Sequence, residues 1–222
     1  MTEMISASQF HEADGTEDWR VVSDGACTFL GTDSFAQAAA LVHAIGELPG
    51  VEAHRPDIDI RPDGVTIRLI TVTEDAYGMS DDDVDLARQI STTARDLGLS
   101  GDPAGVQSFL VVPGALNTAE VMPFWQAVLG YQRRNDTPDE DLVDPRGRGP
   151  SFWFEPMDEL RADGGGAIHV AVWVPPEEGE ARVAAALAAG GRMVRDEFAP
   201  SWWTLADAAG NEADVGTVTG RD

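Results

Sequence analysis

A histidine and two carboxylates in the first half of the chain have the residue types needed for acid/base chemistry. His54 lies within residues 52–57, and Glu74 and Asp83 follow it along the chain. An imidazole titrates near neutral pH, so His54 can donate or accept a proton under ordinary conditions. Glu74, which is surrounded by other carboxylates, is the candidate for a second proton-transfer group. These residues form the first candidate site.

A second candidate site comes from an internal repeat in the second half of the chain. Residues 106–112 correspond to residues 168–174, with a period of about sixty residues. Inward-facing side chains at equivalent positions of two paired units should converge on one interior, where a ligand would bind. Four side chains at such positions carry polar groups: Gln107, Glu155, His169 and Asp214.

The elements that must position the first site are a mixture of helices and strands. Residues 34–48 carry an apolar period near 3.6, which predicts a helix whose buried face includes Phe35, Ala38, Ala39, Val42 and Ile45. Alternation over residues 65–69 predicts a half-buried strand. Residues 80–83 open a second helix, because acidic side chains suit the positive end of a helix dipole.

Each copy of the repeat predicts a strand, a helix and further strands. The helices are expected at 119–129 and 178–189, and each ends before a glycine, Gly130 or Gly190, of the kind that terminates helices with positive φ. One copy alone cannot bury a sheet face, so the two copies are expected to pair into one curved sheet with the helices outside.

A polar segment that contains glycine and proline, residues 100–103, separates the two halves and is the natural linker. We therefore expect an α+β protein with one domain over residues 1–100 and another over residues 106–220.

Composition excludes several classes of function. The formal charge is −24, every basic residue is an arginine, and no basic cluster occurs. Nucleic-acid binding depends on cationic side chains that neutralise phosphates, so no nucleic-acid partner is expected. The single cysteine, Cys27, cannot form an intramolecular disulfide, and no basic leader or long apolar span is visible. A cytoplasmic protein without a membrane partner or a catalytic thiol is expected.

Three patterns of the first half resemble the signature of pterin carbinolamine dehydratases. They lie at residues 52–57, 65–69 and 73–80 together with Asp83, and the likeness extends from about Ile5 to Leu99. The resemblance implies a small α+β domain that dehydrates a hydroxylated tetrahydropterin by acid/base catalysis. It implies catalytic roles for His54, Glu74 and Asp83, and substrate binding by Arg55 and Pro56.

This sequence departs from the family pattern at two positions. The family usually shows His-His-Pro and a later Thr-His, whereas Arg55 stands at the second histidine and Glu74 at the third. An alternative interpretation is that the domain keeps the fold without the chemistry, with Arg55 and Glu74 forming an ion pair.

The second half resembles the glyoxalase superfamily, also called the vicinal oxygen chelate or bleomycin-resistance/dioxygenase superfamily. Residues 124–131 are similar to its helix end, and residues 207–211 to its terminal Asp-x-x-Gly-Asn turn. The resemblance implies two paired βαβββ units. Trp153 and Trp173 are candidates for lining a pocket by stacking, although such residues are more often core.

Carried over position by position, the superfamily's metal ligands would be Gln107, Glu155, His169 and Asp214. This set of nitrogen and oxygen donors suits a divalent Zn, Mn, Fe or Ni ion with positions open for two substrate oxygens. The usual last ligand is Glu, so Asp214 is a departure. In the alternative interpretation, these side chains only satisfy hydrogen bonds.

Together the two halves predict a two-domain metabolic enzyme of the lyase type that acts on small molecules. The first domain would take a pterin-like ligand, and the second a small metabolite. The alternative is a non-catalytic small-molecule or drug-binding protein with a dimerisation-type N-terminal module. A homo-oligomer is expected in either case.

Overall fold

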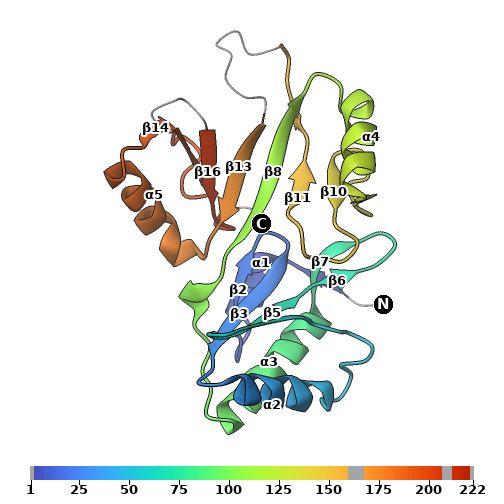
Figure 1. Cartoon of the computed structure of the whole chain (residues 1–222), viewed down its shortest axis with the longest axis vertical. Coiled ribbons are helices and arrows are strands. Elements are labelled where there is room, and N and C mark those ends of the chain that lie inside the picture. Colours follow the sequence, from blue (N-terminus) through green and yellow to red (C-terminus); the bar gives the residue numbers. More distant parts are fainter. Residues whose placement is uncertain (1–2, 160–167, 207–211, 221–222) are drawn as a thin grey trace. The chain divides into compact units, whose positions relative to one another are not determined.

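The computed structural model describes residues 3–159, 168–206 and 212–220 (Figure 1). The contacts within the chain divide it into two compact units, one that extends to Val106 and one that runs from Gln107 to Gly220. We call them the N-terminal and C-terminal units. No helix in the described ranges is long and apolar enough to cross a membrane.

The N-terminal unit contains two small antiparallel sheets and three α-helices. The sheets have the strand orders β2-β3-β5-β4 and β1-β7-β6. In chain order, the elements are β1 (Met4–Ile5), α1 (Ala7–Glu12), β2 (Arg20–Val22), β3 (Gly25–Gly31), α2 (Phe35–Gly46), β4 (Asp57–Arg61), β5 (Gly64–Leu69), β6 (Thr71–Val72), β7 (Tyr77–Ser80), α3 (Asp81–Asp96) and the 3₁₀ turn η1 (Pro103–Gly105).

Strand β5 confirms the predicted alternation. Val65, Ile67 and Leu69 are fully buried, whereas Thr66 and Arg68 are partly exposed. Successive side chains of a strand point to opposite faces, so one face of the sheet forms the core of the unit. Helix α2 packs against β5 and α3.

The buried face of helix α2 differs from the face predicted from the sequence. Phe35 is 73% exposed and Ala39 is also exposed, whereas Ala38, Leu41 and Ile45 are buried. The buried residues follow the i, i+3, i+7 spacing of one helix face. The sequence contains two overlapping apolar stripes on this helix, and only the packing against β5 and α3 selects between them.

Helix α3 begins at Asp81, within the acidic segment that predicted its start, and a capping box closes its first turn. Ser80 is the N-cap residue, and the Asp83 side chain at N3 reaches back to the Ser80 backbone N–H. Such reciprocal bonds satisfy amide groups that lack partners inside the helix. The capping box therefore fixes Asp83 at the point where β7 enters α3.

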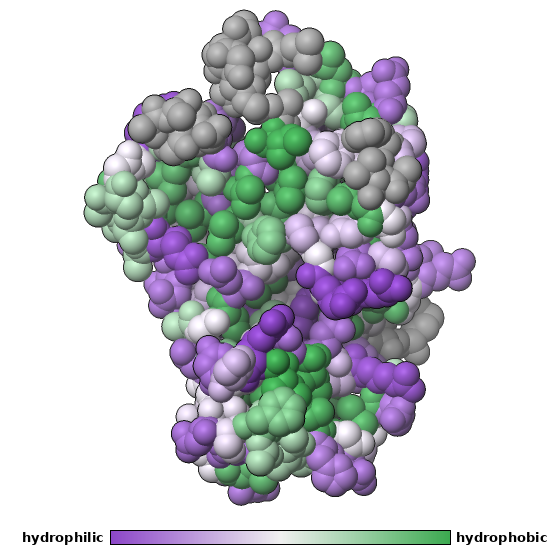
Figure 2. Space-filling view, in the orientation of Figure 1, coloured by the Kyte–Doolittle hydropathy of each residue, from purple (hydrophilic) through white to green (hydrophobic). Residues whose placement is uncertain are grey.

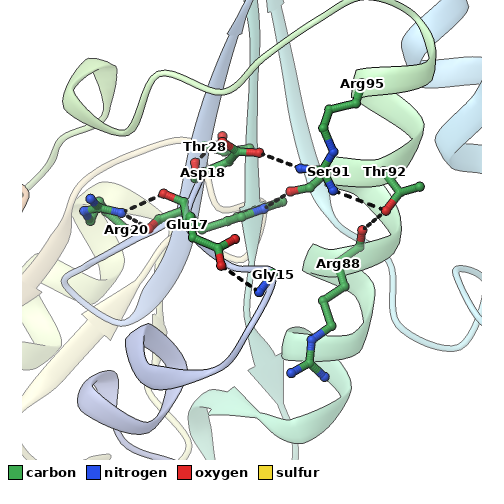
Figure 3. A network of polar contacts seen from close by, with 10 residues as sticks. Gly15, Glu17, Asp18, Arg20, Thr28, Arg88, Ser91, Thr92 and Arg95 are labelled. Carbon is green, nitrogen blue, oxygen red and sulfur yellow. Dashed lines mark hydrogen bonds and ion pairs between the residues drawn. The ribbon is translucent and has the colours of Figure 1, made fainter.

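The segment before β2 is tied to α3 by a polar network (Figure 3). The buried Trp19 ring donates its Nε1–H to Ser91 Oγ at 2.9 Å. Beside it, Arg95 pairs with Asp18 at 3.3 Å. An indole N–H taken out of water needs such a partner, so Ser91 allows Trp19 to fill the core.

The expected linker is held against the N-terminal unit. Gly101 forms a β-bridge with Leu30, and the Asp102 amide donates to the Phe29 carbonyl at 2.7 Å. Val106, three residues after this segment, is 3% exposed. Because these contacts fix its backbone, the segment belongs to the N-terminal unit and is not a flexible linker.

We predict that a fragment of residues 1–106 unfolds at higher urea concentration than a fragment of residues 1–100. The shorter fragment loses the β-bridge at Gly101, the hydrogen bond of the Asp102 amide and the buried Val106 side chain. These losses amount to about 2–4 kcal/mol of unfolding free energy. Equal midpoints would place the domain boundary at residue 100 instead.

The described part of the C-terminal unit contains one long sheet and two α-helices. In chain order, the elements are β8 (Ser108–Ala115), α4 (Thr118–Leu129), β9 (Gln132–Arg133), β10 (Asp141–Val143), β11 (Ser151–Trp153), β12 (Glu155–Pro156), β13 (Ile168–Trp173), the 3₁₀ turn η2 (Pro176–Glu178), α5 (Gly179–Ala188), β14 (Arg192–Arg195), β15 (Trp202–Ala206) and β16 (Glu212–Gly216).

The strand order reproduces the repeat. The order is β14-β15-β16-β13-β8-β11-β10-β9, with β12 pairing to β8 as well. β8 and β13 are antiparallel neighbours at the centre, and each pairs in parallel with the last strands of its own copy. The predicted pairing of two βαβββ units is thus confirmed. Gly130 ends α4 with φ +69°, the positive value that its position required.

The helices lie on one face of this sheet, which we call the helix face. Helix α4 packs on Val111, Phe152 and Phe154, and α5 packs on Val172 and Val215. By alternation and register, the opposite face carries a different set, which we call the open face: Leu110, Val112, Trp153, His169, Ala171, Trp173, Thr204 and Asp214.

The centre of the helix face is apolar and exposed. Phe109, Ile168 and Val170 on β8 and β13 are 48%, 45% and 40% exposed. Hydrophobic residues gather over this part of the unit in Figure 2. Helices α4 and α5 therefore cover the flanks of the sheet and leave its central strands partly bare.

Candidate functional sites

His54 and Asp83 meet in the N-terminal unit although 29 residues separate them. His54 lies in the turn between α2 and β4, and its Nε2 is 2.5 Å from Asp83 Oδ1. The His54 side chain is 20% exposed, whereas that of Asp83 is fully buried. The structure thus joins two of the three predicted catalytic residues, with the imidazole between the buried carboxylate and the surface.

Asp83 is held from the other side by hydroxyl and amide donors. Its Oδ2 accepts hydrogen bonds from Thr71 Oγ1 at 2.8 Å, the Ser80 amide at 2.7 Å and Ser80 Oγ at 3.1 Å. A buried carboxylate needs such donors to remain charged. With Oδ2 fixed in this way, Oδ1 is left to orient His54.

The pKa of His54 is raised above its ordinary value. The main cause is the hydrogen bond to Asp83, which favours the protonated ring. Burial acts in the opposite direction, and the negative charges of Asp83 and Asp82 add to the increase. His54 therefore keeps its proton to higher pH than a free histidine does.

A pocket of about 430 Å³ opens beside His54. It combines apolar walls with acidic and amide groups, so it can hold a flat, polar ring that offers hydrogen-bond donors. The lining residues are Pro49, Gly50, Ala53, His54, Thr71, Val72, Thr73, Asp82, Asp85, Leu86 and Gln89.

The other predicted residues of this site do not line the pocket. Arg55 is exposed and pairs with Glu52 at 2.6 Å, so the alternative ion pair between Arg55 and Glu74 does not form. Glu74 is exposed between β6 and β7, and Pro56 is partly buried at the start of β4. Binding by Arg55 and Pro56 and proton transfer by Glu74 thus remain predictions without a contact that supports them.

We predict that the His54–Asp83 contact stabilises the protein at acidic rather than alkaline pH. A raised pKa gives a contribution that is complete below about pH 6.5, the ordinary histidine pKa, and disappears as pH rises through the folded-state pKa. The unfolding free energies of wild type and His54→Gln should differ by on the order of 1 kcal/mol more at pH 5.5 than at pH 9. Urea unfolding across this range is the measurement, and a difference that does not change with pH would contradict the prediction.

A second histidine–aspartate contact lies on the open face of the C-terminal unit. His169 Nε2 is 3.1 Å from Asp214 Oδ2, and Thr204 Oγ1 donates to Asp214 Oδ1 at 2.6 Å. Burial lowers the pKa of His169, but the hydrogen bond to Asp214 and the charges of Asp214, Glu155 and Glu212 together raise it.

Gln107 is not brought to this pair. Its Oε1 accepts a hydrogen bond from Arg182 of α5 at 3.1 Å, so the side chain turns to the helix side of the sheet. The expected convergence of four residues is therefore wrong for Gln107. Along β8, Ser108, and not Gln107, lies opposite Trp173 on the open face. The register of β8 therefore differs by one residue from the expected equivalence of Gln107 and His169, and such a shift exchanges the faces of a strand.

The remaining C-terminal candidates share the open face. Glu155 pairs in register with Gly114 of β8, which places it on the same face as His169. Trp153, 37% exposed, and Trp173, 8% exposed, lie on this face as well. The structure thus supports a shared surface for these residues, and their binding roles remain predictions.

Comparison with known proteins identifies the N-terminal unit. Residues 3–93 match the family model for pterin 4 alpha carbinolamine dehydratase. A protein of Nocardia farcinica named as a pterin-4-alpha-carbinolamine dehydratase is 39% identical over 95 residues, which cover 42% of this chain and 98% of that protein. The chain belongs to the pterin carbinolamine dehydratase family.

A second relative with the same name, from Acidobacterium capsulatum, is 45% identical over 56 residues, which cover 25% of this chain and 59% of that protein. Because the matches end near residue 93, the family accounts for the N-terminal unit of the chain and not for the rest. The His54–Asp83 pair and its pocket thus lie in the dehydratase-family unit.

The C-terminal unit is a glyoxalase-like domain. Residues 110–216 match the family model of that description. Among solved structures, a glyoxalase/bleomycin resistance protein/dioxygenase superfamily member from Vibrio splendidus aligns with 16% identity and a TM-score of 0.33, covering 50% of this chain and 99% of that one. The turn motif at residues 207–211 lies outside the described residues.

The residues of the glyoxalase-like domain do not fit the expected metal. Each Asp214 oxygen has one hydrogen-bond partner, Thr204 or His169, whereas Gln107 is hydrogen-bonded to Arg182 on the helix side. Within residues 3–159, 168–206 and 212–220, no three His, Cys, Asp or Glu side chains are grouped so that they could hold an ion. A divalent ion needs several converging donors, and among the four expected ligands the described contacts join only His169 and Asp214.

The hydroxyl groups that complete both histidine sites were not among the residues predicted from the sequence. Thr71 and Thr204 each donate to the aspartate that orients a histidine. Thr71 lies two residues after the alternating strand and Thr204 sits in the predicted last strands, but many threonines occupy such places. These two threonines reach an aspartate only because β6 pairs with β7 and β15 pairs with β16.

Cys27, the single cysteine, lies in the interior of the N-terminal unit. It is buried in β3, and burial raises the pKa of its thiol to about 11. The thiolate is the reactive form, so this cysteine is unreactive near neutral pH.

Proposed function

We propose that the dehydratase-family unit removes water from a 4a-hydroxytetrahydropterin, with His54 as the proton-transfer group. The observation that carries the proposal is the His54–Asp83 contact at the edge of a pocket of about 430 Å³. A histidine oriented by a buried carboxylate at a ligand-sized pocket is the arrangement that general acid/base catalysis requires.

The chemistry assigns each group a role. His54, whose pKa is raised, gives its proton to the hydroxyl group on C4a, and the C4a–O bond breaks to release water. A proton on the adjacent ring nitrogen is then lost, which leaves a quinonoid dihydropterin. Asp82 and Asp85 line the same pocket and are candidates to receive that proton, whereas Glu74 lies outside it. Asp83 positions His54 and touches no substrate in this scheme.

The test is the dehydration of 4a-hydroxytetrahydropterin by the full chain, followed through the absorbance of the quinonoid product. Acceleration above the uncatalysed rate, together with calorimetric binding of a stable pterin analogue, is expected. Binding without acceleration would indicate that Arg55 and Glu74, at the family's histidine positions, have removed turnover and left a binding module. Absence of both would overturn the proposal.

For the glyoxalase-like domain we propose binding of a small metabolite on the open face. A homo-oligomer built through the dehydratase-family unit also remains a proposal, which sedimentation analysis of the full chain would test. A single species with the mass of one chain, 23.7 kDa, would contradict it.

A further inference from the structure

A pocket of about 460 Å³ lies on the helix face of the C-terminal unit, between α5 and the loop before β15. Ala199 and Pro200 of the loop form one wall, and Trp203 of β15 contributes its ring. The residues of α5 that line it follow the i, i+3, i+4, i+7 spacing of one helix face: Glu180, Val183, Ala184 and Leu187. The open face and the pocket beside His54 share none of these residues.

Both walls of the pocket are held by one buried residue, Thr217. At the start of α5, a Cβ atom on Gly179 would lie 2.9 Å from Thr217 Cγ2 and 3.0 Å from the Trp203 ring, so glycine lets the helix approach the sheet this closely. On the other side, Thr217 Oγ1 donates to the Pro200 carbonyl at 2.6 Å. The walls are therefore formed before a ligand arrives, as is usual for small-molecule sites.

The lining is apolar apart from one carboxylate. Val183 and Trp203 are each 7% exposed, whereas Leu187 and Pro200 are exposed and accessible. Among the lining residues that the structure describes, Glu180 alone carries a charge, and its side chain is exposed.

No basic side chain in the described ranges pairs with Glu180. Arg182, two residues further along α5, donates to Gln107 at 3.1 Å, and Arg195 pairs with Glu197 at 3.7 Å. The Glu180 carboxylate thus stands at an apolar pocket with its charge uncompensated.

This combination favours a cation with an apolar body. An ammonium group can bind to the Glu180 carboxylate while the hydrocarbon part covers Leu187 and Pro200. An anion would meet both Glu180 and the formal charge of −24 that the chain carries. Since Glu180 is exposed, its charge should change affinity only about two- to fivefold, and apolar contact must supply the rest.

We propose that this pocket binds a small organic cation, an ammonium ion attached to an aromatic or aliphatic body. Glu180 bonds to the ammonium group, and the body lies between α5 and Pro200. The site lies on the opposite side of the sheet from the open face and in a different unit from the dehydratase pocket. It therefore goes beyond both functions proposed above.

The test uses a reporter inside the pocket. The full chain is labelled with 5-fluorotryptophan, and the Trp203 signal in the ¹⁹F NMR spectrum is assigned with Trp203→Phe. The pocket beside His54 has no tryptophan among its lining residues, so a probe bound there does not contact the reporter.

Phenethylamine, the cationic probe, should shift the Trp203 signal saturably, which gives the Kd. 2-Phenylethanol, with a hydroxyl in place of the ammonium group, should bind about two- to fivefold more weakly, and phenylacetate more weakly still. Added NaCl should weaken the amine and leave the alcohol unchanged, because salt screens exposed charges.

Two variants test the two halves of the site. Glu180→Gln should weaken phenethylamine to the level of 2-phenylethanol. Ala184→Phe, which fills the pocket from an exposed position of α5, should weaken both probes about tenfold or more. Ala184→Leu serves if the phenylalanine variant does not fold, as checked by circular dichroism.

Matched controls are available on the same elements. Ala185→Phe makes the same change at the next exposed residue of α5, outside the lining, and Glu177→Gln removes an exposed charge three residues before Glu180. Both should bind phenethylamine like wild type. Absence of a saturable shift at Trp203, equal Kd values for the amine and the alcohol, or an unchanged Kd in both Ala184 variants would each overturn the proposal.

Discussion

Replacement of His54 by alanine is expected to lower the rate of pterin dehydration by about 10²–10⁴-fold, the usual contribution of a general acid or base. The physical reason is the position of the ring: Nε2 is fixed by Asp83 at 2.5 Å, and the side chain lines the pocket of about 430 Å³. Alanine leaves the pocket open but without an oriented proton donor. The rate is measured at saturating substrate, so that weakened binding does not enter the comparison.

The pH dependence distinguishes this role from a structural one. If His54 acts as an acid, the wild-type rate falls as pH rises above the raised pKa of its imidazole. The residual rate of His54→Ala should lack this limb. His43→Ala is the matched control, because it removes an exposed histidine of α2 in the same unit and should leave the rate unchanged. A His54→Ala protein with the wild-type rate would rule out the assigned role.

Replacement of Asp83 by alanine is expected to lower the unfolding free energy by about 3–5 kcal/mol. Asp83 is fully buried, and its loss leaves the hydroxyls of Thr71 and Ser80, the Ser80 amide and the His54 ring without their acceptor. Buried polar groups without partners cost about 1–3 kcal/mol each, and the capping box of α3 is lost at the same time.

Urea unfolding of the full chain measures this effect through the transition of the dehydratase-family unit. Asp81→Ala is the matched control, because Asp81 is an exposed acidic residue in the same first turn of α3. Loss of its interaction with the helix dipole should cost only about 0.3–1 kcal/mol. Comparable effects of the two substitutions would show that the buried network around Asp83 contributes little.

Local patterns in the sequence were sufficient for most elements of the fold. The alternation of Val65, Ile67 and Leu69 predicted β5, the acidic start at Ser80 predicted α3, and Gly130 marked the end of α4. The repeat predicted the pairing of two βαβββ units. These features depend on neighbours a few residues apart, where side-chain periodicity and capping act directly.

Tertiary structure decided which candidates meet. His54 and Asp83 come together because the turn after α2 packs against the start of α3, and Thr71 joins them through the pairing of β6 with β7. Arg55 and Glu74, equally plausible by spacing, remain outside the pocket. Contacts between residues tens of positions apart depend on packing and strand pairing, which no local pattern encodes.

The glyoxalase-like domain also separates what the sequence determined from what the tertiary structure decided. The sequence by itself determined that the chain contains two copies of one unit, and that His169 and Asp214 occupy related strands. Only the register of β8 against β13 decided that Gln107 turns toward Arg182, and only the pairing of β15 with β16 placed Thr204 on Asp214. Because strand side chains alternate with a period of two, a shift of one residue moves a side chain to the opposite face, and this shift separates Gln107 from His169 and Asp214.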